Sequence, residues 1–147
     1  IIVVIGVTLR SVRFGLISVV PNVVPFLLAY GVLSIFTKVV TFSHTVAILI
    51  AIGLVVDATI HFLTKFKKAN SMNLSPYDAI QYCYKYVGYP IIVASVCLFS
   101  GFLFLIQSSF QTNYVLGGMC ALIILLALVI DLLLLPSLLL IFGNKSR

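Results

Sequence analysis

The chain has 147 residues, of which 63% are hydrophobic and 8% are charged, and its mean hydropathy is +1.28. Soluble domains contain roughly 45–50% apolar residues, so this composition excludes a soluble fold and predicts an all-α membrane protein with lipid as its solvent. The net charge of +6 does not indicate a nucleic-acid partner, because the basic residues stand at the ends of apolar runs rather than on one water-facing surface.

The apolar runs predict a bundle of four complete transmembrane helices and part of a fifth. Residues 1–9 are apolar but shorter than the roughly 20 residues that a crossing needs, so we interpret them as the end of a truncated helix in a longer protein. Complete spans are expected over residues 14–36, 43–66, 89–107 and 114–142. Pro21 and Pro25 are expected to bend or interrupt the first complete span, because proline removes a backbone donor.

A polar stretch at residues 67–88 separates the second and third spans and carries its own helix signals. Ser75 suits an N-cap and Pro76 the first helical position. Gly88 and Pro90 are expected to end this helix. Because its apolar residues recur at helical spacing, the stretch predicts an interfacial amphipathic helix.

The positions of the basic residues predict the orientation of the chain. With four crossings, every Lys and Arg except Lys38 falls on the same side of the membrane. The positive-inside rule makes that side the cytoplasm. We therefore expect a multi-pass protein of the cell (inner) membrane, with the loop at residues 67–88 and the C-terminus in the cytoplasm.

Asp57 is the main candidate for chemistry. It precedes Lys65 by eight residues, about 12 Å along a helix, so a lysine at the interface places Asp57 near the bilayer midplane. Gly53, Asp57 and His61 are four residues apart and share one helix face. Apolar surroundings disfavour a charged carboxylate, so such a group can exchange protons near neutral pH. The hypothesis is a proton-coupling site formed by Asp57 and His61.

Structural interpretations remain open for these residues. Asp57 could form a hydrogen bond to a neighbouring helix, and His61 could pack at the interface. Gly53 would allow a helix to approach closely, while Ser95 suits either helix packing or a hydrogen bond to Asp57.

Other polar residues and the cysteines are interpreted structurally. Asp131 is expected near the cytoplasmic end of the last span, in an ion pair with Arg10 or Arg13, and His44 is expected to be solvated at the outer end of its span. The three cysteines have no metal-type spacing, and the sequence has no glycine-rich phosphate loop and no nucleophile beside a base. We therefore do not expect an enzyme, and we expect neither a cofactor nor a metal.

The segment at residues 52–63, with Gly53 and Asp57, resembles the Gly-x-x-x-Asp helix of the resistance-nodulation-division (RND) superfamily, particularly its MMPL-type lipid exporters and hopanoid-transporter relatives. Further stretches resemble that family in the same order, at residues 10–13, 21–25, 88–90, 101–102, 108–110 and 131–136. The resemblance implies most of one six-helix half, the C-terminal one, of a twelve-helix transporter driven by proton entry. It implies that Asp57 is the intramembrane acid, and that His61 matches a histidine common in the MMPL-like branch. Many relatives carry a second acid or a tyrosine where this chain has Ala58.

Three functions follow as hypotheses. The first is a proton-driven exporter of lipids or other hydrophobic molecules. The second is a sterol- or hopanoid-sensing regulatory membrane module, and the third is the protein-translocation accessory branch, which the absence of an acid in residues 64–68 disfavours. The expected partners are the bilayer, a hydrophobic or lipid substrate and the missing N-terminal half. Further copies of the chain or periplasmic components are additional candidates.

Overall fold

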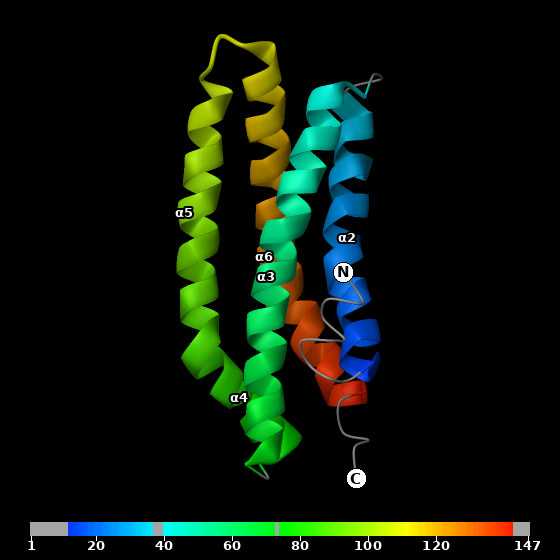
Figure 1. The fold of residues 1–147 in the computed structure, drawn as a ribbon, viewed down its shortest axis with the longest axis vertical. Helices are drawn as coiled ribbons and strands as arrows, with labels where there is room; N and C mark the ends of the chain where they lie inside the picture. The colour runs from blue at the N-terminus through cyan, green and yellow to red at the C-terminus, as the bar shows by residue number, and fades with distance from the viewer. Residues whose placement is uncertain (1–11, 37–39, 73, 143–147) are drawn as a thin grey trace.

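The computed structural model describes residues 12–36, 40–72 and 74–142, which form a bundle of long helices (Figure 1). In chain order the elements are α2 (Val12–Phe36), α3 (Phe42–Ser71), α4 (Pro76–Cys83), the π-helical turn η1 (Tyr84–Gly88), α5 (Tyr89–Ile106) and α6 (Gln111–Phe142). The truncated helix expected at residues 1–9 lies outside the described residues.

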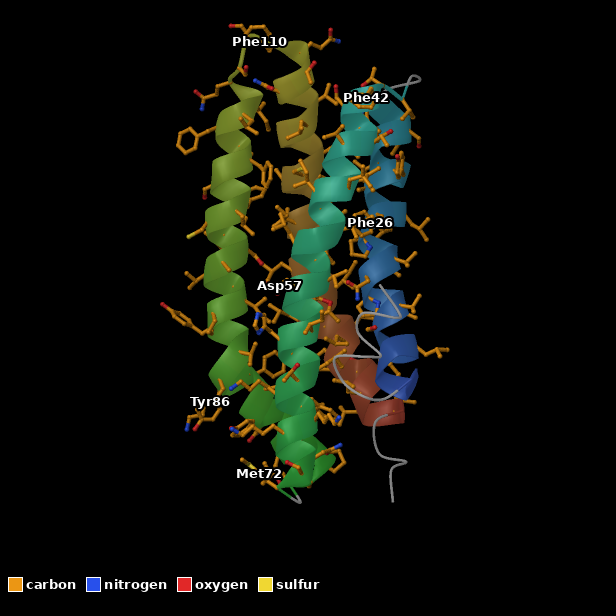
Figure 2. All side chains as sticks on the ribbon, viewed as in Figure 1. Phe26, Phe42, Asp57, Met72, Tyr86 and Phe110 are labelled. Carbon is orange, nitrogen blue, oxygen red and sulfur yellow. The ribbon has the colours of Figure 1, made fainter. Side chains whose placement is uncertain are left out.

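Four of these helical stretches are long and apolar enough to cross a membrane: Gly15–Ile35, Phe42–Ser71, Pro76–Ile106 and Gln111–Ile141. The chain is therefore a multi-pass, all-α membrane protein, as its composition predicts. Successive long helices run in opposite directions, so Phe42 and Phe110 lie at one end of the bundle and Met72 lies at the other (Figure 2).

Helix α6 is the centre of the bundle, because it packs against α2, α3 and α5. Helix α5 has a single buried residue, Ile91, and its contacts are mainly with α6 and η1. As a result α5 stands apart from α3 along most of its length (Figure 1). Two apolar clusters fill the bundle: one joins α3 to α4 and the end of α6 around Phe62 and Phe66, and the other joins α2, α3 and α6 around Ala51 and Ile123.

Helix α4 begins as the sequence predicts but does not end as expected. The Asp78 amide donates to Ser75 Oγ at 3.2 Å, and Pro76 is at the start of the helix. Gly88, however, has ordinary helical angles, and the chain continues through η1 into α5. Pro90 has no amide hydrogen for the carbonyl of Tyr86, and its ring crowds that carbonyl, so the wider π turn accommodates it without ending the helix.

The polar stretch at residues 67–88 also packs differently from a helix lying on the membrane surface. Helix α3 continues to Ser71, and α4 buries Ala79, Ile80 and Cys83. These side chains join the cluster around Phe62 and Phe66. The apolar face of the amphipathic helix is therefore covered by α3 of the same chain rather than by lipid.

Two other helices continue through their prolines. Helix α2 is a single helix despite Pro21 and Pro25, so the interruption considered for this span is not present. In α6, Pro136 leaves the Leu132 carbonyl without its helical donor, and the Tyr84 hydroxyl donates to that carbonyl. Side-chain donors of this kind are how membrane helices satisfy backbone groups that proline frees.

Candidate functional site

Asp57 lies at the middle of α3. A rise of about 1.5 Å per residue places it roughly 22 Å from Phe42 and roughly 21 Å from Ser71. A charged aspartate at the centre of a span costs about 2.5–3.5 kcal/mol on insertion scales, so such residues need water or a polar partner. The local helix supplies one partner, because His61 follows one turn later on the same face.

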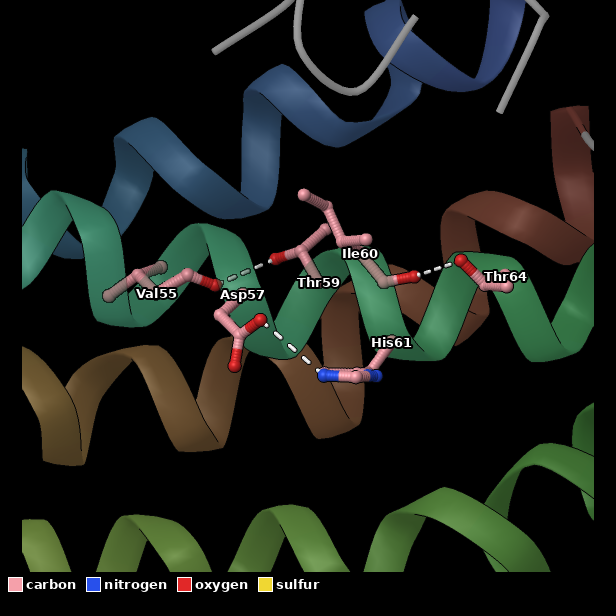
Figure 3. Close-up of polar contacts among 6 residues, drawn as sticks. All are labelled: Val55, Asp57, Thr59, Ile60, His61 and Thr64. Atoms are coloured by element: carbon pink, nitrogen blue, oxygen red, sulfur yellow. Dashed lines mark hydrogen bonds and ion pairs between the residues drawn. The ribbon is translucent and has the colours of Figure 1, made fainter. Parts of the chain in front are cut away.

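The carboxylate and the imidazole form a contact along the helix. Asp57 Oδ1 and His61 Nε2 are 3.4 Å apart (Figure 3). Both side chains are largely open to the surroundings, with exposed fractions of 72% for Asp57 and 66% for His61. The helix spacing predicted from the sequence therefore brings the two groups together, on a face of α3 that the rest of the described chain leaves mostly uncovered.

This face borders a groove of about 360 Å³ between α3 and the α5 side of the bundle. Asp57, His61 and Lys65 line it from α3, while Tyr86 of η1 and Ser95 of α5 line it from the other side. The remaining wall is largely apolar. The groove thus combines a hydrophobic lining with a carboxylate, an imidazole and an amine on one helix. Ser95 lies across the groove from Asp57. Its two predicted roles, helix packing and a hydrogen bond to Asp57, stay predictions.

Gly53 lies on the same helix, and a Cβ there would meet nothing within 4 Å. The helix expected to approach this glycine is therefore not among the described residues. The packing role of Gly53 stays a prediction.

A second polar cluster lies inside the bundle, where sequence reasoning did not place one. Thr59 Oγ1 is 3.2 Å from Asp131 Oδ1 and 3.4 Å from Asn22 Oδ1. All three side chains are buried, and they come from α3, α6 and α2. Two features of the sequence could have indicated this cluster. Each of the three is a polar residue within an apolar span, and Thr59 follows Asp57 by two residues, so it points away from the groove.

The structure places Asp131 deeper than the sequence suggested. Because it contacts Thr59, it is about 3 Å along α3 from the level of Asp57, instead of a turn from the membrane edge. The side chains of Arg10 and Arg13 fall outside the described residues, so the expected ion pair with Asp131 stays untested. Thr59 and Asn22 provide the polar surroundings of Asp131 within the described chain.

His44 is buried rather than solvated. The Thr41 amide donates to His44 Nδ1 at 3.0 Å, and the Thr41 hydroxyl is 2.7 Å from the same nitrogen. The imidazole therefore satisfies backbone and side-chain groups at the start of α3, where a helix leaves its first amides without partners.

The site has the groups for proton exchange and, over the part of the chain described, none of the groupings typical of a metal centre: no three His, Cys, Asp or Glu side chains lie together. A carboxylate can bind a proton and an adjacent imidazole can pass one along. Tyr86 and the apolar wall add a surface on which a hydrophobic molecule can lie.

One of three comparisons with known proteins identifies a family. Searches of curated proteins and of solved structures give no match. The model of the MMPL family, a transporter family, matches residues 1–147. The match covers the whole chain, including the helix that carries Asp57 and the one that carries Asp131, so the protein belongs to the MMPL family and is an RND/MMPL-type transporter membrane region.

Proposed function

We propose that this chain is the membrane domain of a proton-driven exporter of lipids or other hydrophobic molecules, with Asp57 as the proton-coupling residue. The observation that carries the proposal is a carboxylate at the centre of a membrane span, 72% exposed and facing a largely apolar groove. Intramembrane acids of this kind are functional by default, because their insertion is costly.

Proton binding would change the electrostatics of this groove. An ionised Asp57 places a negative charge 3.4 Å from His61 Nε2 and on the same wall as Lys65, and a neutral Asp57 carries no charge there. The two protonation states therefore favour different arrangements of α3 and its neighbours, which is what a coupled conformational change requires. A membrane potential of 100 mV supplies about 2.3 kcal/mol for each proton that enters.

His61 has a secondary role in this proposal. It lies one turn from Asp57, on the side of Lys65, and lines the same groove. The imidazole would carry protons between Asp57 and the end of the bundle that holds most of the basic residues, which we take as the cytoplasmic end. In the proposed setting the protein lies in the inner membrane with its C-terminus in the cytoplasm. Its proposed partners are a hydrophobic substrate, a second transporter half that would face the open side of Asp57, and further copies or periplasmic components.

The groove also favours a second candidate, a regulatory module that binds a sterol- or hopanoid-like lipid. Its largely apolar wall and the Tyr86 ring suit such a ligand without any need for transport. In that case Asp57 would orient the lipid rather than carry protons. The two candidates differ in whether lipid moves across the bilayer when a proton gradient is applied.

The test is Asp57→Asn in the full-length protein reconstituted into vesicles with a fluorescent lipid. If Asp57→Asn cannot bind the proton, transport loses the approximately 2.3 kcal/mol per 100 mV that proton entry supplies, and gradient-driven export should fall at least tenfold. Asp78→Asn is the matched control, because Asp78 is an exposed carboxylate in the first turn of α4, away from the groove. Normal export by Asp57→Asn under a proton gradient would disprove the coupling role, and lipid binding without flux in the unmodified protein would favour the regulatory module.

A further inference from the structure

The buried cluster around Asp131 places one hydroxyl hydrogen, that of Thr59, among three oxygen atoms. The Thr59 hydroxyl lies 3.2 Å from Asp131 Oδ1, 3.4 Å from Asn22 Oδ1 and 3.2 Å from the carbonyl oxygen of Val55. A threonine hydroxyl carries one hydrogen, which can be well aligned with only one of these oxygens at a time. If Asp131 is ionised, the other contacts bring oxygen acceptors together without a proton between them.

The amide of Asn22 does not relieve this shortage. Its Nδ2 donates to the Ser18 carbonyl at 2.6 Å, which fixes the orientation of the side chain and leaves Oδ1 toward Thr59. A proton on Asp131 would resolve the shortage. The neutral carboxyl can donate to Thr59 Oγ1, and Thr59 can then donate to Asn22 or to Val55.

The charged side chains that the structure describes near Asp131 face away from it. On α3, the titratable groups nearest its level, Asp57 and His61, face the groove with Lys65. From α2, Asn22 contacts the Thr59 hydroxyl, which in turn contacts Asp131. From α5, Ser95 lines the same small cavity as Asp131. From η1, Tyr84 donates to the carbonyl of Leu132, beside Asp131. Among the side chains that the structure describes, no cation contacts this carboxyl, and the residue is only 3% exposed.

A small cavity lies between this carboxyl and the groove that holds Asp57. The cavity has a volume of about 30 Å³ and lies between α3, α5 and α6, with Asp131 in its wall. Its wall includes Ala58 and Ser95, which also line the larger groove. A water molecule needs about 10–15 Å³ of such space and two or more polar partners. The cavity offers Asp131 and Ser95 as polar partners for such a water, and only the shared wall at Ala58 and Ser95 separates it from the groove.

We propose that Asp131 is a second proton-binding carboxyl of this membrane domain, held neutral by the Thr59–Asn22 cluster and supplied with protons from the Asp57 groove past Ala58 and Ser95. The proton arrives on groove water and binds an Asp131 carboxyl oxygen, and it leaves by the same route. Thr59 keeps its own hydrogen throughout, so the cluster gains or loses one proton in total. A contribution of this proton to transport rests on the proposed function, whereas its binding does not.

Infrared spectroscopy of the full-length protein in lipid vesicles tests the proposal, because a protonated carboxyl has its own C=O stretch, distinct from that of a carboxylate. The spectrum at neutral pH minus that of Asp131→Asn should contain the band of a protonated carboxyl, and the band should persist in Asp57→Asn. Thr59→Val, which removes the hydroxyl and keeps the shape, should shift the frequency of this band. A difference spectrum that contains only carboxylate bands at neutral pH would overturn the proposal.

The route is tested by the rate at which the Asp131 band shifts after transfer into D₂O. Ala58→Leu fills the wall shared by the two cavities and should slow this exchange at least severalfold. Ala94→Leu is the matched control, because Ala94 is exposed on α5 and lines the groove but not the small cavity. It adds the same volume and should leave the rate unchanged. Equal exchange rates in Ala58→Leu and the unmodified protein would rule out this route.

The infrared measurement and the export measurement can each refute one proposal without refuting the other. If the Asp131 band is absent while Asp57→Asn abolishes export, the second site is wrong and the proposed function stands. If the band is present while Asp57→Asn exports normally, the proposed function is wrong and the second site stands.

Discussion

Gly117 is the residue at which α6 comes against the backbone of α5. A Cβ at this position would lie 2.6 Å from the Phe102 carbonyl oxygen and 2.7 Å from Leu105 Cβ. Gly117→Ala must therefore push the two helices apart, and overpacking of this kind costs roughly 1–3 kcal/mol. We expect a lower melting temperature in detergent or lipid, measured by circular dichroism.

The adjacent glycine provides the matched control for this substitution. A Cβ at Gly118 would meet nothing within 4 Å, so Gly118→Ala should leave the melting temperature unchanged or raise it slightly, because alanine favours the helix. Equal destabilisation by the two substitutions would contradict the close approach at Gly117.

Individual residues show which parts of the site could be predicted from the sequence alone. The four-residue spacing of Asp57 and His61 was enough to predict that they share a face, because helix geometry fixes it. The burial of Asp131 was not predictable, because it depends on which face of α6 meets Thr59 and Asn22, two residues on other helices that are distant in the chain. The expected position of Asp131 near the membrane edge was wrong for the same reason.

At the scale of the helix, Pro136 and Tyr84 form a compensating pair. Pro136 deprives the Leu132 carbonyl of its helical donor, and the Tyr84 hydroxyl supplies another from η1. Tyr84→Phe should destabilise the bundle by about 0.6 kcal/mol, and at most about 1.7 kcal/mol, the range measured for hydrogen bonds between membrane helices. The measurement is the free energy of unfolding in mixed micelles.

A double-mutant cycle distinguishes this pairing from a general effect of the tyrosine. In Pro136→Ala the backbone amide of residue 136 can donate to Leu132, so Tyr84→Phe should cost less there than in the unmodified protein. Tyr89→Phe removes a hydroxyl from a tyrosine that is 73% exposed and should have little effect. An equal cost of Tyr84→Phe in both backgrounds would show that Leu132 is not the acceptor that matters.

The helices themselves were largely predictable because a membrane span has a strong signature of length and hydropathy. The boundaries of the helices were less predictable. Gly88 and Pro90 predicted a break, yet the chain passes through both in a π turn, since a local widening of the helix accommodates proline at less cost than an unpaired backbone in lipid. The burial of α4 on α3 also depends on tertiary contacts that the amphipathic pattern does not specify.

At the scale of the whole molecule, the groove beside Asp57 results from the central position of α6. Helix α5 packs on α6 and η1, leaving the Asp57 face of α3 open. No local pattern in the sequence specifies this choice of neighbours, although Asp57 itself was identifiable as an unusual residue in an apolar run. This open face is the surface on which the proposed second transporter half would pack.

The arrangement of the helices allows the predicted orientation to be tested directly. Met72 is 51% exposed at one end of the bundle, and Phe110 is 75% exposed at the other. In a background where the three native cysteines are replaced by serine or alanine, Met72→Cys and Phe110→Cys each carry one thiol at an opposite end. A membrane-impermeant maleimide applied to intact cells should label Phe110→Cys alone, because the Met72 end carries most of the lysines and is expected in the cytoplasm. Permeabilised cells, in which both thiols should react, provide the control for reactivity. Labelling of Met72→Cys alone in intact cells would invert the orientation, and the His61 side of Asp57 would then face the exterior.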